Sequence, residues 1–161
     1  PVLDPDDPGF LPPGHMPARI RAFCQRTGQR PPGTEGEVVR CILESLALTY
    51  RALAETVRRL TGRAIEAVHV IGGGSRNALH CRFAADATGL PVLAGPAEAT
   101  AIGNVMVQAL ALGVVSSLAE IRDVVRRSFA PIRYEPGDDR DAWDAAYATY
   151  LGLIERSAVR R

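Results

Sequence analysis

Three consecutive glycines stand where a ligand phosphate could approach the backbone. The segment Gly72-Gly73-Gly74-Ser75-Arg76-Asn77 follows the apolar run Val68-His69-Val70-Ile71, and helical periodicity follows the glycines. Glycine adopts positive φ without penalty and has no side chain to hold a ligand away. The start of a helix adds N–H groups and a partial positive charge. A strand, a glycine turn and a helix in this order therefore predict a phosphate-binding corner.

Two common phosphate-binding motifs do not match this glycine run. All 19 basic residues are arginines, so a lysine-containing P-loop is excluded. The dinucleotide fingerprint fits Gly72 and Gly74 but meets Asn77 in place of its last glycine. The acidic residue expected about twenty positions on has no clear counterpart, because Glu98 lies past Gly95-Pro96. We therefore prefer contact with a mononucleotide phosphate, and keep a Rossmann-like NAD site and a turn without ligand as alternatives.

A second strand end is predicted to meet a helix start at residues 94–104, A-G-P-A-E-A-T-A-I-G-N. Small residues there would let the helix approach its neighbours closely. Gly103 inside a helix costs about 1 kcal/mol relative to alanine, so a reason for it is expected. Close packing would be a structural reason, and room for a base or ribose would be a functional one.

Periodicity and turn residues predict the elements that position these two corners. Thr34 and Glu37 form a capping box before a long apolar-striped helix that Gly62 ends, and Ser117 with Glu120 suggests a second capping box. The strand–helix–strand–helix run after Val68 predicts a parallel α/β unit. The expected helices are 17–27, 34–61, 77–88, 99–112, 117–127 and about 140–155, and the expected strands are 68–71, 91–94 and 132–134.

Composition places the chain among globular proteins of one domain. Its 161 residues can bury a core, and 47% hydrophobic with 23% charged residues is ordinary. A net charge of +1 argues against electrostatic binding to nucleic acid or membrane. Neither a signal peptide nor a membrane-spanning run is evident, and three cysteines are too few for a secreted disulfide scaffold, so a cytoplasmic location is expected.

Several other reactive residue types are expected to be structural. Cys24 and Cys41 lie on consecutive helices, where buried free thiols are favoured over a disulfide. His69 is expected to be packed or hydrogen-bonded within its strand. Asp86 lies in mid-helix and is expected to be structural, and Arg76 is a secondary candidate for phosphate contact.

A combination of segments resembles the C-terminal half of FGGY-type carbohydrate kinases, and within that family most closely the rhamnulokinase subgroup. The segments are G-G-G-S-R-N, A-D-A-T-G-L-P-V and A-G-P-A-E-A-T-A-I-G-N-V, with upstream agreement over residues 4–10, 13–17, 27–29 and 40–47. The resemblance runs nearly end to end, and the chain opens like the middle of a larger protein.

The resemblance implies an α/β fold of the ribonuclease-H-like, actin-like ATPase type. It implies ATP and Mg²⁺ as cofactors and phosphorylation of the 1-hydroxyl of L-rhamnulose. Gly73 would contact the phosphates, Asn77 would make a polar contact to the nucleotide, and Gly72 and Gly74 would shape the turn.

The resemblance also implies which parts of the kinase lie in this chain and which lie outside it. Residues 1–33 would be a loop and helical lead-in, and residues 34–161 would be the nucleotide-binding lobe, together one domain. The catalytic aspartate, the sugar pocket and most metal-facing carboxylates would belong to a missing N-terminal lobe, so no catalytic or metal-binding residue is assigned here. The expected activity is that of an ATP-dependent sugar kinase in a longer protein. The alternative is a nucleotide-binding module without turnover, and a lobe without its partner should expose an apolar face.

Overall fold

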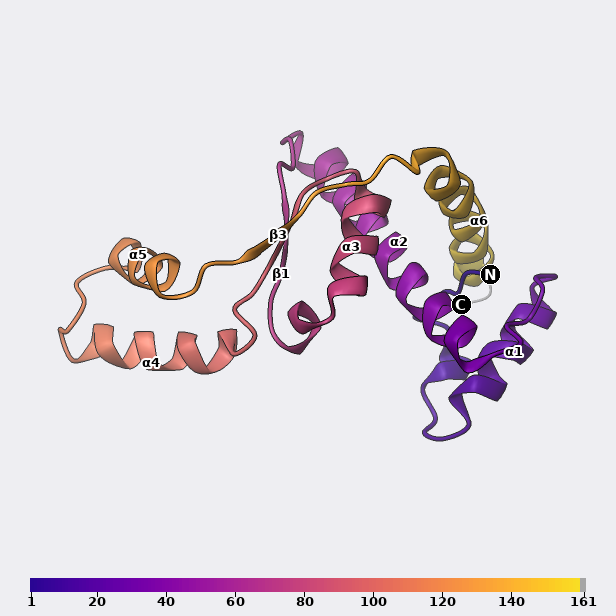
Figure 1. Ribbon diagram of the computed structural model, residues 1–161, viewed down its shortest axis with the longest axis horizontal. Coiled ribbons are helices and arrows are strands. Elements are labelled where there is room, and N and C mark those ends of the chain that lie inside the picture. Colours follow the sequence, from indigo (N-terminus) through magenta and orange to yellow (C-terminus); the bar gives the residue numbers. More distant parts are fainter. Residues whose placement is uncertain (160–161) are drawn as a thin grey trace.

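The computed structural model describes the backbone of residues 1–159 and the side chains of residues 1–156 (Figure 1). Helices dominate it, and a small sheet lies between two groups of helices. The elements in chain order are η1 (Pro8–Phe10), α1 (Met16–Arg26), α2 (Glu35–Thr61), β1 (Val68–Val70), η2 (Gly73–Arg76), α3 (Ala78–Thr88), β2 (Val92–Ala94), α4 (Ala99–Ala111), α5 (Leu118–Ser128), β3 (Ile132–Tyr134) and α6 (Arg140–Val159). Each predicted helix and strand is present to within a few residues.

The sheet is mixed, and its parallel half confirms the predicted α/β unit. Strand order in the described part of the chain is β1-β2-β3, with β1 parallel to β2 and β2 antiparallel to β3. Helix α3 connects the parallel pair and packs along α2. The register pairs Val70 with Ala94, so the two strands end side by side.

The long helix α2 begins and ends at the residues that the sequence predicts. Thr34 accepts the N–H of Glu37 and the Glu37 side chain accepts the N–H of Thr34, which completes the capping box. Gly62 closes the helix at φ 67°. The second predicted capping box is incomplete, because Glu120 accepts the N–H of Ser116 rather than that of Ser117.

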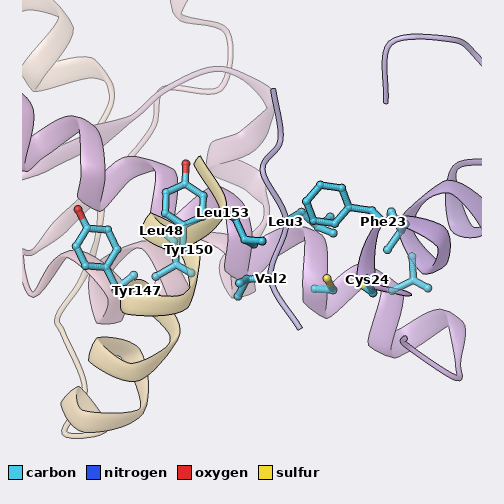
Figure 2. Packing of buried hydrophobic residues seen from close by; sticks show 13 residues of the cluster. Val2, Leu3, Phe23, Cys24, Leu48, Tyr147, Tyr150 and Leu153 are labelled. Carbon is cyan, nitrogen blue, oxygen red and sulfur yellow. The ribbon is translucent and has the colours of Figure 1, made fainter. Parts of the chain in front are cut away.

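One core joins α1, α2, α6 and the N-terminal segment (Figure 2). Figure 2 shows Tyr147, Tyr150 and Leu153 of α6 beside Leu48 of α2, with Val2 next to them. Ser45 links the segment to α2, because its Oγ accepts the N–H of Leu3 at 2.8 Å and donates to the carbonyl of Cys41 at 2.6 Å.

A second, smaller core lies between the sheet and α3. Its buried residues are Val70, Cys81, Ala84, Ala85, Val92 and Ala94. The opposite face of β1 is open, because His69 is exposed; the expectation of a packed His69 is therefore wrong. Side chains alternate between the faces of a strand, so a helix on one face leaves His69 facing solvent.

Helices α4 and α5 extend away from both cores (Figure 1). No residue of α4 is buried, and a side chain added at Gly103 would meet no atom within 4 Å. The expected close packing around Gly103 is therefore not found within the described residues. On α5, Leu118 is 57% exposed, whereas Ile121 is buried.

The cysteines are buried free thiols, as the sequence favoured. Burial raises the pKa of Cys41 to about 12, and it also raises the pKa of Cys24. Both thiols therefore remain protonated and unreactive near neutral pH. Within residues 1–159, no helix has the length and apolar character needed to cross a membrane.

Replacing Ser45 by alanine tests the link between the N-terminal segment and α2. We expect Ser45→Ala to lower the free energy of unfolding by about 1–3 kcal/mol, because the buried N–H of Leu3 loses its acceptor. Urea denaturation measures this. Ser116→Ala removes an exposed hydroxyl bonded to Glu120 and should change stability by less than about 0.5 kcal/mol; equal effects would contradict the prediction.

Candidate functional site

The glycine corner begins at the carboxyl end of β1. Gly72 has φ 75° and ψ −161°, a conformation that is essentially restricted to glycine. A short 3₁₀ helix, η2, follows at Gly73–Arg76, and α3 begins after it at Ala78, within one residue of the predicted start. Ser75 is buried and donates from Oγ to the carbonyl of Gly72 at 2.7 Å. That hydrogen bond closes the turn, a role that sequence reasoning did not assign to Ser75.

The second predicted corner lies against the first. The N–H of Gly95 donates to the carbonyl of Val70 at 2.8 Å, and the N–H of Gly72 donates to the carbonyl of Pro96 at 3.1 Å. Arg76 and Glu98 form an ion pair at 3.0 Å across the two corners. Both side chains are about 70% exposed, so the pair contributes at most about 1 kcal/mol.

The backbone of the corner is open to a ligand. Within the described residues, no hydrogen bond engages the N–H of Gly73 or Gly74. A methyl group added at Gly73 would meet no atom within 4 Å, and at Gly74 it would approach only Val70. Free N–H groups beside open space are the requirements for backbone contact with an anion.

Asn77 caps α3 and still has a group that can make the predicted polar contact to a nucleotide. Its side-chain oxygen accepts the N–H of His80 at 3.0 Å and caps α3. The side-chain amide nitrogen is therefore the group that would contact a ligand. Gly72, Gly73, Gly74 and Asn77 lie together at this corner, as the sequence placed them, and their contact with nucleotide remains a prediction.

A partly buried pair of rings supports the first turn of α3. The His80 Nε2 atom lies 3.2 Å from the hydroxyl of Tyr50 on α2, and the two rings meet edge to face. Burial lowers the pKa of His80, so the ring is neutral near pH 7. Burial and the neighbouring Cys81 thiol raise the pKa of Tyr50. Sequence reasoning missed this pair, since only the helix packing brings two residues thirty positions apart into contact.

Carboxylates do not gather at the corner. Asp86 accepts the N–H of Gly137 at 2.7 Å, in agreement with the structural role expected for it. Among the described residues, no group of three or more His, Cys, Asp or Glu side chains could hold a metal ion. The corner can position an anion through the free N–H groups of Gly73 and Gly74.

Comparisons with known proteins place this geometry in a family. Residues 1–112 match the profile of the FGGY family of carbohydrate kinases, C-terminal domain. The chain belongs to this family. It is 51% identical over 153 residues to a rhamnulokinase from Bacteroides thetaiotaomicron, and 41% identical over 137 residues to one from Halalkalibacterium halodurans. These matches cover 95% and 85% of the chain, but 31% and 29% of the two relatives.

Solved structures agree on the fold of this FGGY chain. A xylulose kinase from Rhodospirillum rubrum superposes with a TM-score of 0.60 at 25% identity, over 80% of this chain and 26% of its own. Plasmodium falciparum glycerol kinase with ADP also gives 0.60, at 17% identity over 88% of this chain and 30% of its own. The fold is that of the actin-like ATPases, as the sequence predicted.

Alanine at Gly72 tests the backbone conformation of the FGGY corner. We expect Gly72→Ala to lower the free energy of unfolding by about 1–3 kcal/mol, because its φ and ψ are unfavourable for alanine. Thermal unfolding measures the loss. Gly73→Ala is the matched control, and it should change stability by less than about 0.5 kcal/mol because the added methyl meets open space. A neutral Gly72→Ala would show that the turn is not constrained.

Proposed function

We propose that this chain is the nucleotide-binding C-terminal part of an ATP-dependent sugar kinase of the rhamnulokinase type, which transfers a phosphoryl group to the 1-hydroxyl of L-rhamnulose. The observation that carries the proposal is the open glycine corner in a chain 51% identical to a rhamnulokinase over nearly its whole length. A kinase works where ATP is present, so the proposal retains the predicted cytoplasmic location.

The proposed role of the corner is to hold the phosphates of ATP. The N–H groups of Gly73 and Gly74 would donate to phosphate oxygens, and the Asn77 amide nitrogen would make a further polar contact. Gly72 and Gly74 would keep the turn in shape. Phosphoryl transfer depends largely on positioning and charge neutralisation, and these contacts would supply the positioning.

The rest of the reaction is assigned to the remainder of a longer protein. The chain spans 31% of the rhamnulokinase from Bacteroides thetaiotaomicron. We propose that the general base, the sugar pocket and the carboxylates that face Mg²⁺ lie in that remainder. Alone, residues 1–161 would bind nucleotide without turnover. Residues 34–161 would form the nucleotide-binding lobe, with residues 1–33 as its lead-in.

The exposed apolar surface supports such a partner lobe. Strand β1 lies at an edge of the described sheet, and a groove of about 460 Å³ runs beside it. Leu53 and Val57 of α2 line this groove and are 57% and 47% exposed. Natural proteins rarely leave an apolar strand edge uncovered. We propose that the remainder of the protein covers this groove.

Replacing Gly73 by alanine tests the proposed phosphate contact in the intact protein. We expect Gly73→Ala to lower ATP-dependent phosphorylation of L-rhamnulose about 100-fold, because the methyl group would displace the phosphates. A coupled assay for ADP release measures the rate. Gly152→Ala on α6, where an added methyl also meets no atom within 4 Å, is the control and should retain activity. An active Gly73→Ala enzyme, or a wild type inactive on L-rhamnulose, would contradict the proposal.

A charge in the groove tests the proposed cover. We expect Leu53→Glu to lower the free energy of unfolding of the intact protein by about 2 kcal/mol, since a covered carboxylate would lack a partner. The same substitution in residues 1–161 alone should change stability by less than about 0.5 kcal/mol. Leu11→Glu, at a side chain 83% exposed and outside the groove, should be neutral in both proteins. Equal effects of Leu53→Glu in the two proteins would contradict the cover.

A further inference from the structure

Tyr50 of α2 and His80 of α3 form a polar contact between the two helices. The Tyr50 hydroxyl and the His80 Nε2 atom are 3.2 Å apart, and the ring centroids are 5.4 Å apart at 64°. His80 is 6% exposed. Its Nδ1 atom is buried and has no hydrogen-bond partner among the described residues. Two apolar side chains would pack there without leaving a polar atom unpaired, so the contact is not explained by stability alone.

The pair connects α2 to the glycine corner through a short path. His80 is the third residue of α3, and its backbone N–H donates to the side-chain oxygen of Asn77. Tyr50 lines the groove beside β1 together with Val70 and Ile71, which lead directly into Gly72. A change in how the His80 ring sits against α2 would therefore move the first turn of α3 and the Asn77 amide.

We propose that Tyr50 and His80 are positioning residues for the nucleotide. Their hydrogen bond sets the rotation of the first turn of α3 relative to α2, and this rotation aims the Asn77 amide nitrogen at the ligand. A directional hydrogen bond selects one arrangement of two helices, whereas apolar packing tolerates several. The inference rests on the proposed function, because Asn77 serves a nucleotide only if the corner binds one.

A second tyrosine hydroxyl also bonds to α2, away from the corner, and provides a control for Tyr50. The Tyr150 hydroxyl of α6 lies 3.1 Å from Thr49 Oγ1 of α2, next in sequence to Tyr50. Tyr150 is 4% exposed. Tyr150→Phe therefore removes a buried tyrosine hydroxyl bonded to the same helix, in a contact that includes neither His80 nor Asn77.

The decisive experiment compares Tyr50→Phe with Tyr150→Phe in the intact protein. We expect Tyr50→Phe to raise the KM for ATP about 2- to 13-fold, the range that corresponds to one net hydrogen bond, with kcat and the KM for L-rhamnulose unchanged. Tyr150→Phe should leave all three constants unchanged. An unchanged KM for ATP in Tyr50→Phe, or the same rise in Tyr150→Phe, overturns the inference.

Hydrogen exchange separates this inference from the proposed function. Amide exchange of residues 72–80, measured without nucleotide, should be about 2- to 13-fold faster in Tyr50→Phe than in wild type or Tyr150→Phe. If exchange accelerates but wild type binds no ATP, the corner is positioned as inferred and the proposed function fails. If ATP binds but exchange in residues 72–80 is unchanged, the positioning inference fails alone.

Substitutions at His80 provide the rescue test. His80→Gln retains a side-chain donor and acceptor near the Tyr50 hydroxyl, and it should keep the KM for ATP within about 3-fold of wild type. His80→Leu removes the polar contact, and it should raise this KM as Tyr50→Phe does. The double variant Tyr50→Phe/His80→Leu should be no worse than His80→Leu alone, because one hydrogen bond cannot be lost twice. Additive effects, or a His80→Gln variant as impaired as His80→Leu, overturn the inference.

Discussion

The parallel pairing of β1 with β2 is the constraint on which the corner depends. Because Val70 is in register with Ala94, the carboxyl ends of the two strands lie together, and Gly95 can donate to the carbonyl of Val70. The same alignment brings the carbonyl of Pro96 to the N–H of Gly72. A shift in register would separate these groups. The open backbone of Gly73 is therefore a consequence of strand pairing twenty residues further along the chain.

The sequence predicted the elements well because their signals are local. Thr34, Glu37 and Gly62 act on backbone groups within four residues, so the limits of α2 could be read directly. Burial was predicted less well because it depends on distant neighbours. Leu118 and His69 have the sequence pattern of buried residues, yet both are exposed. The apolar pattern identifies a face to be covered, but it does not say whether this chain supplies the cover.

The same distinction between local signals and distant contacts applies to the residues of the candidate site. Gly72, Gly73, Gly74 and Asn77 are consecutive or nearly so, and a strand before them with a helix after them was enough to bring them together. Ser75 and the Tyr50–His80 pair could not be assigned that way. Ser75 has a role because of the turn geometry, and Tyr50 meets His80 because α2 crosses the first turn of α3. Contacts between elements can be predicted only when the packing of the elements is known, and the sequence of one segment does not contain that information.

One part of the chain buries its own apolar residues and another leaves them exposed. The glycine corner lies between these two parts. On one side, α1, α2, α6 and the N-terminal segment close a core of their own. On the other side, α4 buries no residue, and Val105, Val107 and Leu112 on or next to it are at least 63% exposed. The apolar face of a helix is normally buried against another element. Helix α4 begins just after Glu98, which is paired with Arg76, so α4 starts beside the glycine corner. Tyr50 and His80 contact the corner from the opposite side, where α3 packs on α2, so its geometry depends on the packing of this chain.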